Sequence, residues 1–512
     1  MPNIKSSYNK IYFIAAIISG ASLTLSFAPF RLWIFSYLSI ASLIFLLNHS
    51  SVHIGYLGFF WGLGFFGSSV SWIFVSIYRY GGTSWLLSAF ITSLFICLLS
   101  LFPAIHLILL KKFKLTNINN WRFLIAFPAS WVLIEIFRSW IFTGFPWVLL
   151  GYTQLNSWLK YYASCFGVYG VSFIVAFIAS LLCWGYYKKL TTKIIVASLI
   201  LILFGLALLL KNINFASDHK KTNTVAIIQG NIAPDDKFLF QDINTLINRI
   251  NEIYFHPTVN LFDNNMIKPI DLVIWPENSL PLATNHPDAQ YFLHNIDQFA
   301  KQHNFGLLLG VPIAAKNYNY FYNSVLGLGM ATGVYHKINL VPFGDYVPFE
   351  LWLRGIINFF NLPMSSFIPG KHYQPGIIFN NNKILATVCY DIVYASQLRN
   401  RVVDLNPSVI VAVSEDGWFG DSLGPHQHLD IARMRAIETG KYILRATTSG
   451  ISAIIDNYGN IVKDTPMLQK SILIGLYQDC LNNTIWNKIG NNPIILFLIT
   501  GLTIAIMARR DV

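Results

Sequence analysis

Nearly continuous apolar runs fill the first 210 residues, and they constrain this chain more than any other feature. A helix needs about 20 apolar residues to cross a bilayer. Runs near that length occupy 11–30, 32–47, 54–77, 85–110, 121–137, 161–187, 193–210 and 489–507. Charged residues make up only 12% of the chain, against about 25% in soluble domains. We therefore predict a polytopic helical membrane region with about eight spans.

Basic residues near the ends of these runs predict the orientation. They form four groups: Lys5 and Lys10; Lys111, Lys112 and Lys114; Lys188, Lys189 and Lys193; Arg509 and Arg510. All four groups fall on one side of an eight-span arrangement, and the positive-inside rule assigns that side to the cytoplasm. We expect cytoplasmic termini and an outward-facing region 212–487. A cleaved signal peptide is the alternative for the first run, which is long and has no clear A-x-A site.

The net charge of +12 does not indicate a nucleic-acid partner, because much of the excess lies in these cytoplasmic loops. There it orients helices and meets anionic lipid. We therefore expect the lipid bilayer as a partner and no nucleic acid.

Cysteine and histidine usage predicts neither a metal nor a cofactor. Three of the five cysteines lie within predicted spans, and Cys389 and Cys480 lie in 212–487. A disulfide between these two is the alternative to free thiols, but it would consume a candidate nucleophile. No metal-binding motif or glycine-rich phosphate loop occurs. His426 and His428 have no third ligand nearby, which favours hydrogen-bonded loop structure.

Region 212–487 differs in pattern from the rest of the chain. Short runs rich in Val and Ile predict strands at 224–229, 271–275, 306–311, 323–328, 384–390, 408–414, 442–447 and 452–457. Helical spacing occurs over 288–303 and 428–439. We predict a layered α/β domain at 212–487, between a membrane domain of about seven helices at 1–211 and a last spanning helix with a short tail at 488–512.

Glu277, Lys337 and Cys389 each follow a short apolar run of this domain. A thiol is mostly protonated at neutral pH and needs a base to become a nucleophile. A carboxylate supplies the base, and a lysine supplies fixed positive charge beside an oxyanion. The backbone N–H of Tyr390 is a second candidate donor to that oxyanion. The three residue types together indicate acyl transfer through a thioester.

The surrounding segments resemble the Glu-Lys-Cys triad of the nitrilase superfamily: VIWPENS holds Glu277, YHKINLVPFGDYVPF holds Lys337 and ILATVCYDIVYASQLR holds Cys389. Within that superfamily, the chain looks most like the apolipoprotein N-acyltransferases. Further matching segments are FAPF at 27–30, FTGFPW at 142–147, QGNI at 229–232 and WFGDSLGPHQH at 418–428. The arrangement of spans before and after the domain also matches, and ordinary soluble nitrilases lack it.

This resemblance implies an α-β-β-α sandwich in which Glu277 accepts protons, Lys337 stabilises the oxyanion and Cys389 is the nucleophile. It implies acyl transfer from a membrane phospholipid to the α-amino group of a diacylglyceryl-cysteine on an apolipoprotein. It also implies a monomer in the bacterial inner membrane, with the catalytic domain on the periplasmic side and no cofactor.

Three positions depart from the family pattern. Asp345 and Asp391 stand where Glu is usual, and Phe238 stands near a usual Trp. These three residues, with Tyr390 and Trp418, are candidate auxiliary or substrate-binding residues. For the two aspartates the alternative is capping of backbone N–H groups in turns. The apolar segment FELWLRGIINFFNL at 349–362 is a candidate lipid entrance, and its alternative is a helix packed into the sandwich.

Two other functions remain open from the sequence. A membrane-anchored amidase would hydrolyse the same thioester with water, but it would not need seven preceding spans. A transporter with an accessory domain would need ionisable residues along an intramembrane pathway. Such residues are sparse, and the main ones are Glu135 and Arg138.

Overall fold

The computed structural model describes residues 2–49, 52–186, 188–211, 213, 222–233, 242–263, 269–316, 320–342, 344–346 and 367–508. Phe238, segment 349–362, Arg509 and Arg510 lie outside these residues, so what we expect of them remains a prediction. The chain divides into two compact units. The helical unit comprises Met1–Phe74, Trp85–Asn214 and Lys488–Val512. The sheet unit comprises Val75–Ser84 and Phe215–Asn487.

Each of the eight apolar runs contains a helix. The helices are α1 (Pro2–Leu23), α2 (Ile34–His49), α3 (Ile54–Ser69), α5 (Trp85–Lys112), α6 (Trp121–Arg138), α7 (Ala163–Tyr186), α8 (Leu190–Lys211) and α16 (Asn492–Met507). A short helix α4 (Ile73–Val75) follows α3, and the 3₁₀ helix η5 (Trp158–Tyr162) leads into α7.

The predicted count of about eight spans is not confirmed. In the described part of the chain, three helices are long and apolar enough to cross a membrane: Trp85–Lys112, Trp158–Tyr186 and Leu190–Lys211. A fourth span results if Ile54–Ser69 and Ile73–Tyr80, bent by 59°, count as one. Three of the remaining helices fall short for reasons that their sequences show. Helices α2 and α16 have 16 residues each, and α6 carries three charged side chains.

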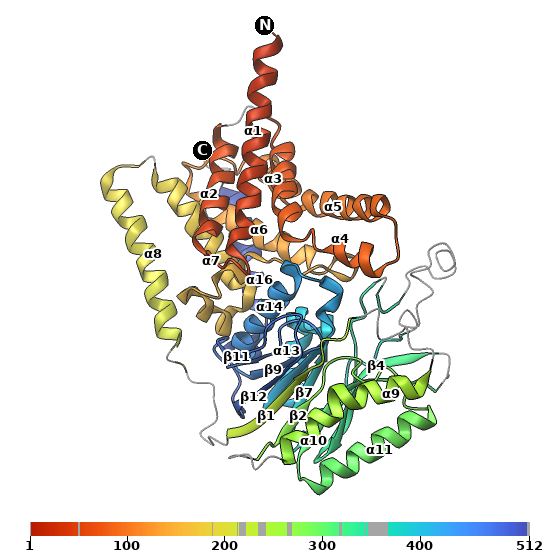
Figure 1. Ribbon diagram of the computed structural model, residues 1–512. Helices are drawn as coiled ribbons and strands as arrows, with labels where there is room; N and C mark the ends of the chain where they lie inside the picture. Colours follow the sequence, from red (N-terminus) through yellow and green to blue (C-terminus); the bar gives the residue numbers. More distant parts are fainter. Residues whose placement is uncertain are drawn as a thin grey trace. The chain divides into compact units, whose positions relative to one another are not determined.

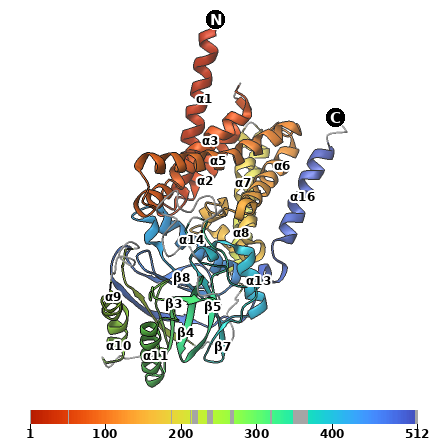
Figure 2. The same ribbon diagram turned by 90° about the vertical axis from the view of Figure 1, so that its right-hand side faces the viewer.

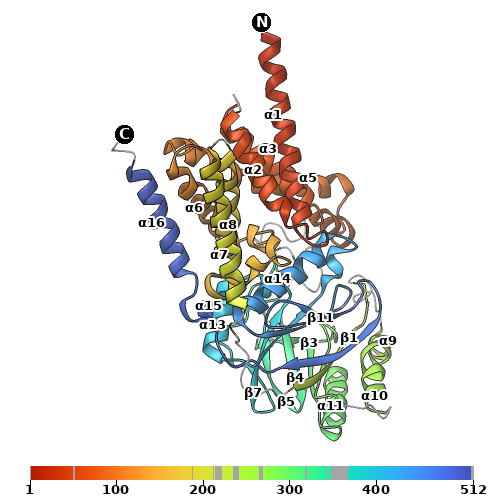
Figure 3. The ribbon, with the colours of Figure 1, turned by 90° about the vertical axis from the view of Figure 1, so that its left-hand side faces the viewer.

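Small residues allow the helices of this unit to approach closely. A side chain at Gly20 or Gly64 would collide with backbone atoms between α1 and α3, and one at Gly58 would collide with backbone atoms of α5. Figure 1 shows α1 and α3 side by side. Helix α16 packs on α6 and α7 (Figure 2), where Phe497 meets Phe173 edge to face with ring centroids 5.3 Å apart. Helix α8 runs beside α7 (Figure 3).

The sheet unit contains one continuous twelve-stranded sheet in the order β11-β10-β9-β8-β7-β6-β5-β4-β3-β2-β1-β12. The strands are β1 (Thr222–Gln229), β2 (Leu272–Ile274), β3 (Gly306–Ala314), β4 (Phe321–Gly329), β5 (Ala331–His336), β6 (Ile377–Phe379), β7 (Asn382–Val388), β8 (Val409–Ser414), β9 (Tyr442–Thr447), β10 (Ala453–Ile455), β11 (Ile461–Asp464) and β12 (Ser471–Gln478). Pairing is parallel within β1-β2-β3 and within β7-β8-β9, and antiparallel elsewhere. All eight predicted strands are present.

Alternating side chains build two cores on opposite faces of this sheet. Val225 and Ile227 of β1 join an inner core to which both halves of the sheet contribute. Ala226 and Ile228 face an outer core with α9 (Ile243–Ile250), α10 (His256–Asp263) and α11 (Pro287–Gln302), which lie together in Figure 1. Helices α13 (Ala395–Leu405) and α14 (Leu423–Thr439) connect the strands of the second half. The sheet is therefore curled and barrel-like, and the sandwich implied by the resemblance is not confirmed.

A ten-residue segment between helices of the other unit belongs to the sheet unit. Within Val75–Ser84, a π-helical turn η2 spans Ser76–Tyr80. Ser76 Oγ donates to the carbonyl of Trp418 at 2.8 Å. The Tyr80 ring packs edge to face on the Trp418 ring at 5.3 Å. The predicted apolar run 54–77 includes only the first three residues of this segment.

Candidate active site

The three predicted triad residues follow the ends of three different strands, and the structure gathers them into one charged cluster. Glu277 follows β2, Lys337 follows β5 directly, and Cys389 follows β7 directly. Lys337 Nζ lies 3.7 Å from Glu277 Oε1. The charges of both residues act on the Cys389 thiol. Because strand ends place these side chains at one edge of the sheet, residues distant in sequence can cooperate.

The Glu277 carboxylate is buried, with only 3% of the residue exposed. Oε1 accepts a hydrogen bond from Asn323 Nδ2 at 2.7 Å, and Oε2 accepts one from the backbone N–H of Glu415 at 2.7 Å. Burial raises the pKa of Glu277, Lys337 opposes the rise, and the charges of Asp345 and Glu415 add to it. A carboxylate with a raised pKa suits reversible proton transfer near neutral pH.

Close backbone packing fixes the position of Glu277. The Gly310 N–H donates to the carbonyl of Pro276 at 3.1 Å, and the Leu280 N–H donates to the carbonyl of Gly310 at 3.2 Å. A Cβ at Gly310 would lie 2.6 Å from the Cα of Glu277. The missing side chain at position 310 therefore allows the Glu277 turn to rest against β3.

Lys337 is a buried, fixed cation. Its Nζ lies 2.7 Å from Asp345 Oδ2, and that carboxylate oxygen also accepts the Val341 N–H at 2.8 Å. Burial opposes the lysine's charge, but Asp345 and Glu277 outweigh it and hold the pKa of Lys337 above its ordinary value. The residue therefore stays an ammonium group, which can stabilise an oxyanion.

Cys389 occupies a strained turn at the start of the 3₁₀ helix η10 (Cys389–Val393). Its φ is +48°, a left-handed conformation that costs a non-glycine residue about 1–3 kcal/mol and clusters at functional sites. Its side chain is only partly buried. Burial and the charge of Glu277 raise the pKa of the thiol, and Lys337 partly offsets them. The sulfur is therefore a thiol at neutral pH and needs a base to react.

The auxiliary candidates lie in different places. Asp345 bonds directly to Lys337. Asp391 is buried and accepts hydrogen bonds from Tyr335 Oη at 2.8 Å and from the Asn339 N–H at 2.8 Å, so it joins the Cys389 turn to the loop after Lys337. Tyr390 directly follows Cys389 in η10 and packs edge to face on Tyr394 at 5.3 Å.

Trp418 lies in the short helix η11 (Asp416–Phe419), against Tyr80 of segment Val75–Ser84. Phe238 is outside the described residues.

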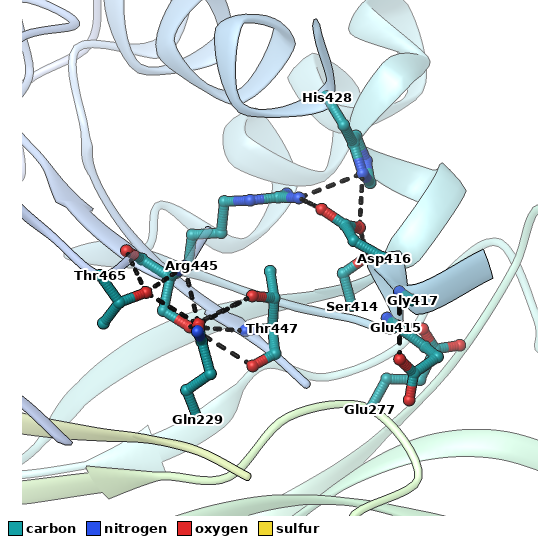
Figure 4. Close-up of polar contacts among 11 residues, drawn as sticks. Gln229, Glu277, Ser414, Glu415, Asp416, Gly417, His428, Arg445, Thr447 and Thr465 are labelled. Atoms are coloured by element: carbon teal, nitrogen blue, oxygen red, sulfur yellow. Dashed lines mark hydrogen bonds and ion pairs between the residues drawn. The ribbon is translucent and has the colours of Figure 1, made fainter. Parts of the chain in front are cut away.

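Sequence reasoning missed several residues of this neighbourhood. Asn323 and Glu415 both bond Glu277. Asn323 appeared only as the first residue of a predicted strand, and Glu415 lies one residue past the end of another. His426 and His428, for which loop structure was favoured, both lie within α14, because this helix begins at Leu423, five residues before the predicted helical range 428–439, and Ser422 caps its N-terminus. Figure 4 shows His428 together with Asp416 and Arg445, next to Glu415 and Glu277.

All five cysteines are free thiols, Cys389 and Cys480 included. Among the described residues, no group of three or more His, Cys, Asp or Glu side chains is placed to hold a metal ion.

Comparisons with known proteins cover nearly the whole chain. The apolipoprotein N-acyltransferase N-terminal domain matches residues 19–181, and the carbon-nitrogen hydrolase domain matches residues 224–478. Three relatives named apolipoprotein N-acyltransferase are similar to it. Those of Vibrio parahaemolyticus and Coxiella burnetii are each 34% identical over 96% of this chain, covering 96% and 99% of their own lengths. That of Pseudomonas putida is 35% identical over 90% of both chains.

Among solved structures, an amidase from Nesterenkonia sp. AN1 is similar over 55% of this chain and 97% of its own, at 14% identity and a TM-score of 0.37. The sequence relatives match at more than 30% identity along both units. By that match this chain belongs to the apolipoprotein N-acyltransferase family.

Proposed function

We propose that this protein transfers an acyl chain from a membrane phospholipid, through a thioester on Cys389, to the α-amino group of the N-terminal diacylglyceryl-cysteine of apolipoproteins. The family supports the overall reaction. The observation that carries the mechanism is the buried cluster in which Glu277 and Lys337 act together on the Cys389 thiol. Such a cluster contains a base, a cation and a nucleophile in one place.

In the first half-reaction, Glu277 accepts the thiol proton while Cys389 Sγ attacks the ester carbonyl of the phospholipid. The ammonium of Lys337 and the backbone N–H of Tyr390 stabilise the oxyanion. When the C–O bond breaks, the leaving alkoxide takes the proton from Glu277 and departs as a lysophospholipid. The acyl chain remains as a thioester.

In the second half-reaction, the neutral α-amine of the acceptor attacks the thioester carbonyl. Glu277 takes a proton from the attacking nitrogen, and the same oxyanion donors act again. Breaking the C–S bond releases the amide product and a thiolate, which recovers its proton from Glu277. The enzyme returns to its starting state, so a ping-pong scheme needs no cofactor.

Both substrates are lipids, and this fits an inner-membrane enzyme with apolar helices on either side of its catalytic region in sequence. In our proposal the protein is a monomer with domains at 1–211, 212–487 and 488–512. About eight spans place residues 212–487 on the periplasmic side, with both termini in the cytoplasm. Segment 349–362 and Phe238 are candidates for lipid contact.

Intact mass spectrometry after incubation with phospholipid tests the proposal. The wild-type protein should gain one acyl mass that hydroxylamine removes, and Cys389→Ala and Glu277→Gln should gain none while staying folded. Adding a diacylglyceryl-cysteine peptide should discharge the acyl group as a triacylated amide, because only a free amine is nucleophilic. A peptide with a blocked α-amine is the control.

Normal transfer by a folded Cys389→Ala protein would rule out the thioester. Rapid release of free fatty acid without peptide acylation would replace the transferase with an anchored amidase-type hydrolase.

A further inference from the structure

A buried charged cluster lies behind the nucleophile and takes no part in the mechanism above. It consists of Asp416, His428 and Arg445, each at most 1% exposed. Arg445 Nη2 donates to Asp416 Oδ2. His428 Nδ1 lies 3.0 Å from Asp416 Oδ1 and 3.1 Å from Arg445 Nη2. Figure 4 shows the carboxylate of Asp416 between the guanidinium and the imidazole.

Two contacts connect this cluster to the reacting groups. Helix α14, which carries His428, packs against η10, whose first residue is Cys389 in its strained left-handed conformation. Asp416 directly follows Glu415, whose backbone N–H holds Glu277 Oε2 at 2.7 Å. The cluster is therefore connected to the nucleophile through the helix that carries His428, and to the base through Glu415, the neighbour of Asp416.

Asp416 is itself rigidly held. Ser414 Oγ at the end of β8 donates to Oδ1 at 2.6 Å. On the other side, a Cβ at Gly450 would lie 2.5 Å from the Cβ of Asp416, so the loop after β9 lies directly against it. With the carboxylate confined by three elements, a shift of the 414–417 turn would require several contacts to break together.

The cluster also adds little net charge beside the sulfur. Burial opposes the charge of Asp416, but Arg445 and His428 keep the pKa of its carboxyl well below the usual range. Burial and Arg445 lower the pKa of His428, so its imidazole is neutral at neutral pH. Buried ion pairs contribute little net stability compared with apolar side chains of the same volume. A role beyond stability is therefore needed to account for three buried polar groups here.

We infer that Asp416, His428 and Arg445 are positioning residues for acyl transfer, holding the Cys389 turn in its reactive conformation and presenting the Glu415 N–H to Glu277. The inference rests on the proposed role of Cys389. None of the three needs to touch substrate. A displacement of about 1 Å in a reacting group can lower a rate by about 100-fold. Loss of this positioning should therefore have a measurable effect on the reaction rate of Cys389.

The test separates positioning from stability by replacing the ion pair as a whole. Asp416→Leu alone leaves the Arg445 charge buried and should lower Tm strongly. The double variant Asp416→Leu with Arg445→Met removes both charges and should regain most of that Tm. The readout is carbamidomethylation of Cys389 by iodoacetamide at fixed pH without lipid, followed by mass spectrometry of the Cys389 peptide. We expect the double variant to react at least about tenfold more slowly than wild type.

A matched control uses a buried ion pair on α14, the helix that carries His428. Asp430 and Arg433 of α14 are paired at 2.9 Å, and Asp430→Leu with Arg433→Met should leave Cys389 reactivity at the wild-type level. A wild-type alkylation rate in the Asp416 and Arg445 double variant would overturn the inference and leave the cluster a purely structural role.

If the double variant fails to fold, His428 decides the question. His428→Gln retains a donor and an acceptor, and should react faster than His428→Leu at equal Tm. Equal rates for the two would also overturn the inference. Because alkylation needs no lipid, a failure of the transferase proposal appears separately, as missing acyl-enzyme in a wild-type protein whose Cys389 alkylates normally.

Discussion

At the scale of single residues, the charges of one ammonium group and two further carboxylates act on the Glu277 carboxylate. Glu277, Asp345 and Glu415 are each at most 6% exposed, and Lys337 is the cation among them. Like charges close together cannot all ionise easily. The proton affinity of Glu277 is therefore set by the balance between Lys337, which lowers its pKa, and the two other carboxylates, which raise it.

This balance predicts opposite pH shifts for two substitutions. Glu277 accepts the thiol proton only when ionised, so Cys389 alkylation should rise with pH through the pKa of Glu277, above the ordinary carboxyl range. Lys337→Met removes the group that lowers this pKa, so the rise in the alkylation rate should occur at higher pH. Asp345→Asn removes a group that raises the pKa of Glu277, so the rise in the alkylation rate should occur at lower pH. The measurement is the pH profile of Cys389 carbamidomethylation.

Asp297→Asn is the control for this pair, because that carboxylate bonds Lys301 on α11 and should leave the profile unchanged. Shifts of Lys337→Met and Asp345→Asn in the same direction would contradict the charge balance described above.

At the scale of elements, the site depends on strand ends meeting. Sequence was enough to propose Glu277, Lys337 and Cys389 as candidates, because each follows an apolar run and belongs to a recognisable segment. It was not enough to find Asn323 or the 414–416 turn, since their contacts arise only when β4 and β8 take their places beside β3 and β7. Strands β5, β6, β11 and β12 also escaped prediction: β6 and β11 have only three and four residues, but β5 and β12 have six and eight.

The contact between β3 and the Glu277 turn predicts a sharp effect of one methyl group. Gly310→Ala puts a Cβ 2.5 Å from the carbonyl of Pro276 and 2.6 Å from the Cα of Glu277, so the turn must move. We expect acyl-enzyme formation to fall by about 100-fold, with Tm lowered but the protein still folded.

Gly327→Ala on the neighbouring strand β4 is the control, because its nearest contact is 3.1 Å away, at the side chain of Ile377. Intact mass after a timed incubation with phospholipid measures both variants. Acylation at the wild-type rate in Gly310→Ala would show that Glu277 does not depend on this packing.

At the scale of the whole molecule, hydropathy located the helices but not the boundary between units. Each apolar run contains a helix, yet part of the 54–77 run continues past a bend into Val75–Ser84 of the sheet unit. The hydropathy of a residue such as Tyr80 is the same whether its side chain faces lipid or packs on Trp418. Its partner is more than 300 residues away in sequence, so no local pattern reveals the contact.

The basic groups predict which side of the membrane each segment faces. An impermeant lysine reagent added outside cells stripped of their outer membrane should label Lys301 and Lys383 of the sheet unit. It should not label Lys111, Lys112 or Lys189 until the inner membrane is opened. All five side chains are exposed in the structure, so burial does not explain a difference. The reverse pattern would invert the proposed topology.

The placement of Val75–Ser84 has a consequence for how the protein is made. This segment leaves the ribosome long before the remainder of its unit. Its contacts with Trp418 can form only after several further helices have been synthesised and inserted. The sheet unit is thus completed late and from two separate stretches of the gene. A gene fragment starting at Phe215 would encode every residue of the triad but neither Ser76 nor Tyr80. The complete sheet unit therefore cannot be exchanged between proteins as one contiguous stretch of gene.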